Sequence, residues 1–316
     1  MSAPHNSVRA RVNAYLRERR RAGCALTVIG SQLLSFARFA EERDHRGPLT
    51  CALALAWAQQ SRRATDKTAA GRLAQLRPFA KFCHRLDPRN EIPPAQFFGP
   101  AYRQRIPHLY SLQEIRSLLA AAACWPPRGC LRADSYATLF GLLAATGLRL
   151  SEALGLKCRD VDFTHDLLHI RDGKFHKARY VPLHSSTTSA LRHYAMRRDR
   201  RIPDPFTPKF FLSDEGRPLS LRTVQSVFER LRERLGWLRC NGRPAPRIHD
   251  LRFTFVCRRL ERWYAKDFDI DRMILSLCTY VGHVNVTSTY WYLMATPELM
   301  RLAAQRFHRA VVGGVP

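Results

Sequence analysis

Apolar residues recur at helical spacing through the first part of the chain. Four segments carry such a stripe: residues 7–22, 27–43, 50–61 and 65–86. In the first of them one face holds apolar residues and the opposite face holds arginines; the apolar residues are Val8, Val12, Tyr15 and Leu16. The pattern predicts a four-helix, arginine-studded domain over residues 1–88.

A proline-rich stretch follows this helical unit. Residues 89–107 contain Pro93, Pro94, Pro100 and Pro107. Proline lacks a backbone donor and biases the preceding residue towards extended geometry, so the stretch is typical of a linker between domains. Ser111 and Glu114 then form a capping-box pattern that opens a predicted helix over 112–123. We therefore expect a second domain over residues 108–316.

The second domain mixes helical segments with two short alternating ones. Residues 166–171 and 178–183 alternate like strands around a turn at Gly173–His176, which predicts a β-hairpin. Ser151 is expected to cap a short helix that runs to Leu156. The remaining predicted helices are 134–146 and about 187–199, 220–235, 248–262, 270–279, 285–294 and 297–310. The fold class is therefore mostly α, with a small antiparallel β-hairpin or sheet.

The charge balance narrows the choice of partner. The 316 residues include 52 Lys and Arg against 26 Asp and Glu, a formal net charge of +26, and 46% hydrophobic residues exclude a disordered basic tail. Residues 1–107 hold 19 basic and 7 acidic side chains, so both halves of the chain carry the excess. A polyanion is the simplest partner for such a chain, and nucleic acid is the commonest polyanion.

The sequence contains neither a secretion signal nor a membrane span. No stretch approaches 18 apolar residues, and the N-terminus has no apolar signal core. The nine cysteines are scattered and include no C-x-x-C pair, which argues against a disulfide framework or a cysteine-rich zinc site. We expect a soluble protein of a reducing cytoplasm without membrane attachment.

Four short segments carry side chains suited to phosphate chemistry. Arg149 follows a glycine at the start of a predicted helix, and Lys174 lies at the hairpin tip. His249 and Arg252 are three residues apart and share a helical face, where they offer a hydrogen-bond donor and a bidentate fork to an anion. Val281-Gly-His283 precedes Tyr292. Alone, the first, second and fourth segments are more typical of a surface arginine, a solvated turn and an amphipathic tyrosine. His249 alone is equally compatible with a helix-capping histidine.

Taken in order, these segments resemble the tyrosine recombinase (phage integrase-like) family. Thr146-Gly-Leu-Arg149-Leu-Ser-Glu152 is similar to the first arginine box, and Gly173-Lys174 before Arg179-Tyr-Val-Pro-Leu looks like the catalytic-lysine hairpin. His249-x-x-Arg252 matches the second box, and Tyr292 follows Gly-His283 by nine residues, as the nucleophile does in the family. The resemblance implies a two-domain DNA clamp. Its N-terminal part is a four-helix, SAM-like core-binding domain and its second part a mixed α/β catalytic domain.

Some positions depart from the family pattern or leave a choice. Val281 replaces the usual leucine, and the stretch from Arg252 to His283 is longer than in compact members. Tyr290 competes with Tyr292 as nucleophile, and the spacing from His283 favours Tyr292. Lys177 competes with Lys174, which stands directly after the turn glycine.

The resemblance implies metal-free phosphoryl transfer. Tyr292 would attack a DNA phosphodiester and form a 3′-phosphotyrosyl bond, with no cofactor and no metal ion. Glu152 is expected to orient Arg149, and Asp250 to cap the His249 helix rather than to bind metal. The resemblance gives the other predicted catalytic residues these roles. Arg149 and Arg252 would clamp the phosphate, and His283 would hydrogen-bond it. His249 would accept the tyrosine proton, and Lys174 would protonate the leaving oxygen.

The expected partner is double-stranded DNA. The family resemblance implies a homotetramer on two duplexes, assembled through exchange of the C-terminal helix at about 297–310; the alternative is a helix that folds back on its own domain. The predicted role is integration, excision or transposition of a mobile element in the bacterial cytoplasm, associated with the nucleoid. Alternatives are Xer-like resolution of chromosome or plasmid dimers, a type IB topoisomerase, and a catalytically silent DNA-binding protein.

Overall fold

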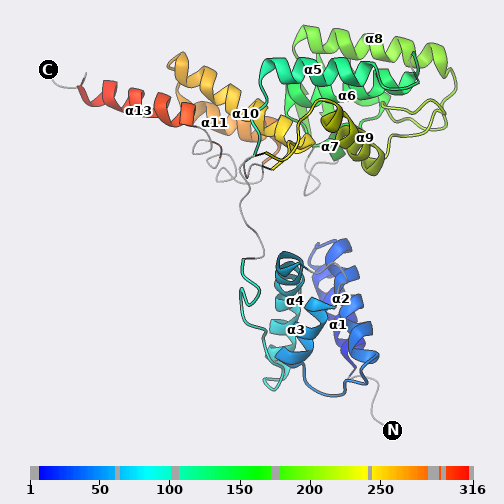
Figure 1. Cartoon of the computed structure of the whole chain (residues 1–316), viewed down its shortest axis with the longest axis vertical. Coiled ribbons are helices and arrows are strands. Elements are labelled where there is room, and N and C mark those ends of the chain that lie inside the picture. Colours follow the sequence, from blue (N-terminus) through cyan, green and yellow to red (C-terminus); the bar gives the residue numbers. More distant parts are fainter. Residues whose placement is uncertain are drawn as a thin grey trace. The chain divides into compact units, whose positions relative to one another are not determined.

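The chain consists of two compact units, residues 1–105 and 106–316 (Figure 1). Each unit has an apolar core of its own. The computed structural model describes residues 7–60, 65–100, 107–127, 129–171, 178–240, 244–283, 292 and 297–312.

The first unit contains four helices that begin and end within two residues of the predicted ranges. They are α1 (Val8–Arg21), α2 (Thr27–Glu41), α3 (Cys51–Gln59) and α4 (Asp66–Leu86). The hydroxyls of Ser7, Thr50 and Thr65 each accept a hydrogen bond from the backbone N–H three residues later, which satisfies an otherwise unpaired donor at the helix start. The apolar stripes meet in an aromatic core formed by Tyr15, Phe36, Trp57, Phe79 and Phe82.

The first part of the predicted linker packs against these helices. Asn90 is buried, and its side-chain oxygen accepts hydrogen bonds from Arg11 and from the backbone N–H of Leu49. Glu91 accepts one from the N–H of Cys51 at the start of α3. The density of prolines predicted a linker from residue 89. In the structure, Asn90 and Glu91 instead accept hydrogen bonds from N–H groups of the first unit, because polar groups removed from water need partners.

The second unit is built around α6 (Leu131–Thr146), which packs against α5, α8 and α10. These partners are α5 (Leu112–Ala123), α8 (Ser185–Arg201) and α10 (Ile248–Ala265). The predicted Ser111–Glu114 capping box is present at the start of α5. The helix α9 (Leu221–Arg234) packs against α5 and α7 (Leu150–Gly155).

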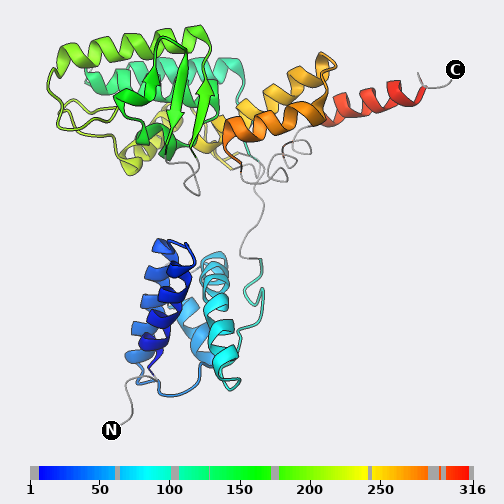
Figure 2. The same cartoon turned by 180° about the vertical axis from the view of Figure 1, so that it is seen from behind.

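A small antiparallel sheet completes this unit (Figure 2). Its strands are β1 (Val161–Asp162), β2 (Leu167–Ile170) and β3 (Arg179–Pro182), in that order across the sheet. The register pairs Leu168 with Val181 and Ile170 with Arg179. The two predicted hairpin strands are thus present, and β1 is an additional strand that was too short to produce an alternating pattern.

Three predicted helix boundaries were wrong, and one predicted helix lies largely outside the described residues. The helix α10 ends at Ala265 rather than at about residue 262. The helix α6 begins at Leu131 rather than at residue 134. In α7 the N-cap is Arg149 rather than Ser151, because the Glu152 carboxylate accepts a hydrogen bond from the Arg149 N–H. Of the helix expected over 285–294, the described residues include Tyr292 alone.

The last helices lie next to α10. They are α11 (Ile270–Val281) and α13 (Pro297–Val312), and both contact α10 of the same chain. Leu299 of α13 is buried there. Among the described residues no helix is long and apolar enough to cross a membrane.

Gly147 ends α6 in a left-handed conformation. Its φ of 64° is unfavourable for any residue with a side chain, and an added Cβ would lie 2.6 Å from Cδ1 of Phe255 on α10. Glycine is therefore required where the chain passes from α6 to Arg149.

We expect Gly147→Ala to lower the free energy of unfolding by about 2 kcal/mol or more, from backbone strain and overpacking. Urea denaturation measures this change. The matched control is Gly141→Ala, within the same helix, where the added Cβ would lie 3.8 Å from Leu119. That substitution should be neutral or stabilise the protein by roughly 0.5–1 kcal/mol. Equal effects of the two substitutions would contradict this account.

Candidate active site

Three arginines from different elements bind the carboxyl end of α11. Arg149 donates from Nη2 to the carbonyl oxygen of Gly282 at 2.8 Å. Arg252 donates from Nη2 to that of Val281 at 2.7 Å, and Arg179 from Nε to that of Tyr280 at 2.9 Å. The last carbonyls of a helix have no partner within the helix and carry its negative partial charge, so guanidinium groups are favourable there. His283 follows directly, and its position is therefore set by these contacts.

Glu152 fixes Arg149 from the other side. Its carboxylate accepts hydrogen bonds from Nη1 of Arg149 at 2.7 Å and from the Arg149 backbone N–H at 3.1 Å. The Glu152 side chain is only 2% exposed. Burial alone would raise its pKa, but the hydrogen bonds and charges of Arg179 and Arg149 outweigh burial and hold the pKa below its usual value. Glu152 is therefore an ionised orienting group, as predicted.

Arg252 lies deeper than Arg149. It is 2% exposed, and Nη1 donates to the carbonyl oxygen of Gly147 at 2.7 Å. Burial and the nearby positive charge of Arg149 lower its pKa to about 10. It still carries a full charge at neutral pH.

His249 is the second residue of α10 and is exposed to solvent. Partial desolvation, and then the charges of Arg252 and Arg247, lower its pKa below 6.5. Asp250 caps the helix start by accepting a hydrogen bond from the Arg247 N–H at 2.9 Å, in agreement with the capping role predicted for it. A neutral imidazole has one unprotonated ring nitrogen, so His249 can accept a proton at pH 7.

His283 is half-buried after the left-handed turn at Gly282. Desolvation, together with the charges of Arg252, Arg149, His249 and Arg179, lowers its pKa to about 4. The side chain is therefore a neutral hydrogen-bonding group throughout the physiological range.

Tyr292 stacks against His283 in the same chain. The ring centroids are 5.8 Å apart, and Phe253 stacks on Tyr292 at 5.1 Å. Tyr292 is 6% exposed and shares an apolar cluster with Val256, Leu260 and Leu299. Burial raises its pKa, although the charge of Arg252 and a hydrogen bond to it act in the opposite direction. The phenol is therefore protonated at neutral pH and needs a base to react.

The structure brings together five of the six predicted catalytic residues, from α7, α10, the end of α11 and the segment before α13. They are Arg149, His249, Arg252, His283 and Tyr292. Lys174 and its competitor Lys177 lie outside the described residues, and so does Tyr290. Arg179 also belongs to this cluster. In the sequence, Arg179 was noted only as part of the motif that resembles the catalytic-lysine hairpin, and no role was predicted for it. Its partners lie far away in the sequence, so no local pattern indicates them.

The cluster suits a tetrahedral or pentavalent phosphate. Three guanidinium groups surround one carboxylate, so the net charge is positive. In the described residues, the contacts of Arg149 with Glu152 Oε1 and Gly282 use two of the five N–H groups of its guanidinium. Arginine forks bind phosphate oxygens in bidentate fashion, and a tyrosine hydroxyl beside them is a potential nucleophile.

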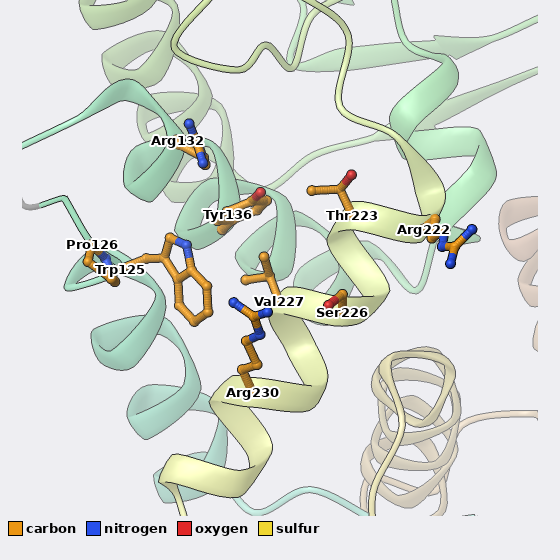
Figure 3. A pocket seen from close by; sticks show the side chains of 9 residues that line it. All are labelled: Trp125, Pro126, Arg132, Tyr136, Arg222, Thr223, Ser226, Val227 and Arg230. Carbon is orange, nitrogen blue, oxygen red and sulfur yellow. The ribbon is translucent and has the colours of Figure 1, made fainter.

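A separate cavity of about 470 Å³ lies between α6, α9 and the loop after α5 (Figure 3). Three arginines line it: Arg132, Arg222 and Arg230. Arg222, Ser226 and Arg230 are spaced by four residues and so share one face of α9. None of the five predicted catalytic residues that the structure describes lines this cavity, so its size does not mark the candidate active site.

Comparison with known proteins gives the family of the chain. Residues 111–298 match the model of the phage integrase family. The integrase/recombinase y4rB of Sinorhizobium fredii is 39% identical over 308 residues, which cover 96% of this chain and 98% of that protein. Tyrosine recombinase XerC of Chlamydia trachomatis is 29% identical over 244 residues, or 77% of this chain and 72% of the relative.

Solved structures share the fold at lower identity. The Tn1549 transposon integrase in complex with transposon right end DNA aligns with a TM-score of 0.66 and 18% identity, over 94% of this chain and 99% of the other. A lambda integrase dimer bound to a COC′ core site aligns with a TM-score of 0.60 and 17% identity, over 90% of this chain and 76% of the other. With the family model and the relative that spans almost the whole chain, these likenesses confirm the resemblance seen in the sequence: the protein belongs to the phage integrase family of tyrosine recombinases.

Proposed function

We propose that the protein is a site-specific recombinase that cleaves and rejoins DNA through a covalent bond to Tyr292. The observation that carries the proposal is the stacking of Tyr292 on His283, with Arg252 hydrogen-bonded to the phenol in the same chain. This arrangement favours cleavage by a protomer's own tyrosine. A mobile-element role is supported by y4rB, which spans nearly the whole chain, and by the fold of the Tn1549 integrase. The XerC relatives favour dimer resolution as the second candidate role.

In the first step, the Tyr292 oxygen attacks the scissile phosphorus. The bond from phosphorus to the 5′-oxygen breaks, and a 3′-phosphotyrosyl bond forms in its place. His249 accepts the phenol proton, and Lys174 supplies a proton to the leaving 5′-oxygen. Attack by a 5′-hydroxyl of the partner duplex reverses these steps. Because one phosphodiester is exchanged for another, no nucleotide cofactor is required.

Arg149 and Arg252 stabilise the charge that develops on the non-bridging oxygens. Both are held by bonds to the backbone, so little reorganisation is needed as the charge forms. His283 donates a further hydrogen bond to the phosphate. We propose that these fixed donors take the place of a metal ion in the reaction. The protein would act on DNA in the cytoplasm of a bacterium, as its named relatives are bacterial.

Tyr292→Phe should abolish covalent capture of DNA because it removes the attacking oxygen. The assay is a nicked suicide substrate that carries the recombination site, with the adduct resolved on a denaturing gel. Wild-type protein should form the adduct in the presence of EDTA.

The matched control is Tyr290→Phe, which should form the adduct at the wild-type rate. If Tyr290→Phe loses the adduct while Tyr292→Phe retains it, the nucleophile is misassigned. If EDTA prevents capture, the metal-free mechanism is wrong.

Cleavage should keep more than half of its rate as the pH falls from 8 to 6.5. Burial and neighbouring positive charges lower the pKa of His249 from its ordinary value of 6.5, so more than half of the base is still neutral at that pH. The measurement is the second-order rate constant of adduct formation at limiting DNA, since that profile reports groups of the free enzyme. His249→Gln should be slower and should lack this acid limb. A wild-type midpoint above 6.5 would contradict the assignment.

We further propose that α13 links neighbouring protomers in a tetramer on two duplexes. Leu299 anchors the start of α13 on its own α10, but Phe307 near the other end is 71% exposed and Met300 is 53% exposed. The surface of α10 and α11 contains an apolar cavity of about 160 Å³, lined by Phe255, Trp263, Leu277 and Tyr280 together with Arg259 and Ser276. An exposed aromatic side chain and an apolar cavity form a suitable pair for contact between copies.

Phe307→Ala should impair synapsis of two duplexes at least ten-fold, because truncating a buried interface aromatic costs about 2 kcal/mol or more. Its melting temperature should stay unchanged, since the side chain is exposed in the single chain. Arg301→Ala, on the same helix, serves as the control and should leave synapsis intact. Gel mobility of paired-duplex complexes measures the effect. Normal synapsis by Phe307→Ala would rule out this contact.

A further inference from the structure

Arg179 makes an unusually complete set of contacts for a residue with no assigned role. It is the first residue of β3, and its side chain is 8% exposed. Nη1 and Nη2 donate to the two Glu152 oxygens at 3.2 and 2.9 Å. Nε donates to the carbonyl oxygen of Tyr280 at 2.9 Å, and Nη2 also to that of Val281 at 3.4 Å. A guanidinium has five N–H donors, and these bonds use four of them.

These contacts connect Glu152, which binds Arg149, to the end of α11, which leads into His283. Through Glu152, Arg179 braces the carboxylate that orients Arg149. Through the carbonyls at the end of α11, it braces the turn that leads into His283. A second bond ties the same elements together, since the Tyr280 hydroxyl donates to the carbonyl oxygen of Pro182 in β3.

The backbone at Gly282 is shaped around this guanidinium. A Cβ added at Gly282 would lie 2.7 Å from Nη1 of Arg179 and 2.8 Å from Cζ, and φ at Gly282 is 70°. Glycine is thus needed for two reasons, the left-handed turn and the close approach of the arginine. Gly282 and Arg179 therefore pack directly against each other.

We infer that Arg179 is a positioning residue of the cleavage reaction: it fixes Arg149 and His283 relative to each other without touching the phosphate. The inference rests on the proposed function of the site. Its bonds are directed at protein groups, and its low exposure leaves little surface for a substrate oxygen. Because one planar group makes all four bonds, a lysine with its single ammonium cannot reproduce them.

The decisive experiment compares Arg179→Lys and Arg179→Gln with wild-type protein in single-turnover cleavage of the suicide substrate at saturating DNA. Both variants should show a cleavage rate constant at least ten-fold lower, with the DNA dissociation constant within about two-fold of wild type. Wild-type failure to form the Tyr292 adduct would overturn the proposed function. A wild-type adduct with fully active Arg179→Lys would overturn the present inference alone.

Arg171→Gln is the matched control. Arg171 directly follows β2, next to the Ile170–Arg179 pair, and binds the Asp160 carboxylate at 2.6 Å, so it is another arginine–carboxylate pair of the same sheet. Among the described residues Arg171 forms no hydrogen bond or ion pair with Glu152 or α11. The cleavage rate constant of Arg171→Gln should therefore remain within about two-fold of wild type. Equal loss in Arg171→Gln and Arg179→Gln would show a general effect on the sheet and overturn the inference.

A double-mutant cycle separates positioning from an independent contribution. Arg149→Ala should slow cleavage roughly a hundred-fold, as loss of one transition-state donor does. Adding Arg179→Gln to Arg149→Ala should slow it by a clearly smaller factor than Arg179→Gln does alone, because one of the two groups it positions is already absent. Fully multiplicative effects would overturn the inference.

Folding is followed in parallel by thermal unfolding of each free variant. Arg179→Lys keeps a positive charge beside Glu152, so it decides the question if Arg179→Gln does not fold. A purely structural role would reduce the amplitude of cleavage through loss of folded protein and leave the rate constant of the active fraction unchanged. That outcome, or unfolding of both variants, would also overturn the inference.

Discussion

The candidate active site depends on the attraction between three guanidinium groups and the carbonyl end of α11. Arg149, Arg179 and Arg252 come from α7, β3 and α10, and each donates to a carbonyl among residues 280–282. The carbonyls at a helix end are unpaired and partly negative, so they satisfy the arginines and are satisfied by them. This one set of bonds fixes the turn into His283 and the positions of the three guanidinium groups.

Such a gathering of like charges requires a compensating anion, and Glu152 provides it. A buried carboxylate is costly to ionise, yet its bonds to Arg149 and Arg179 keep its pKa low. The contacts of the carboxylate therefore hold the arginines at fixed positions despite their mutual repulsion. Burial, and then the positive charges of the neighbouring arginines, lower the pKa values of His249 and His283 and so keep both imidazoles neutral at pH 7.

Tyr292, the proposed nucleophile, is held by apolar contacts rather than by charge alone. Tyr292 stacks between Phe253 and His283 and lies in the cluster that also buries Leu299 at the start of α13. Because Tyr292 and the first turn of α13 share an apolar cluster, the proposed contact of α13 with a second protomer would also affect the position of Tyr292. The large net charge of +26 has a different role: most of its 52 basic residues lie outside the catalytic cluster and are available for phosphate contacts along DNA.

The sequence by itself determined the helical segments, the hairpin strands, the basic character of both halves and the chemical types at the site. Periodicity, turn residues and the ordered motifs are local features, so they can be read from neighbouring positions. Tertiary structure alone decided that Arg149 binds Gly282, 133 positions away, and that Arg179 binds Tyr280, 101 positions away. It also made Arg149 the N-cap of α7 and packed Asn90 on the first unit. These outcomes depend on which distant donor meets which unpaired carbonyl or N–H, and no local pattern carries that information.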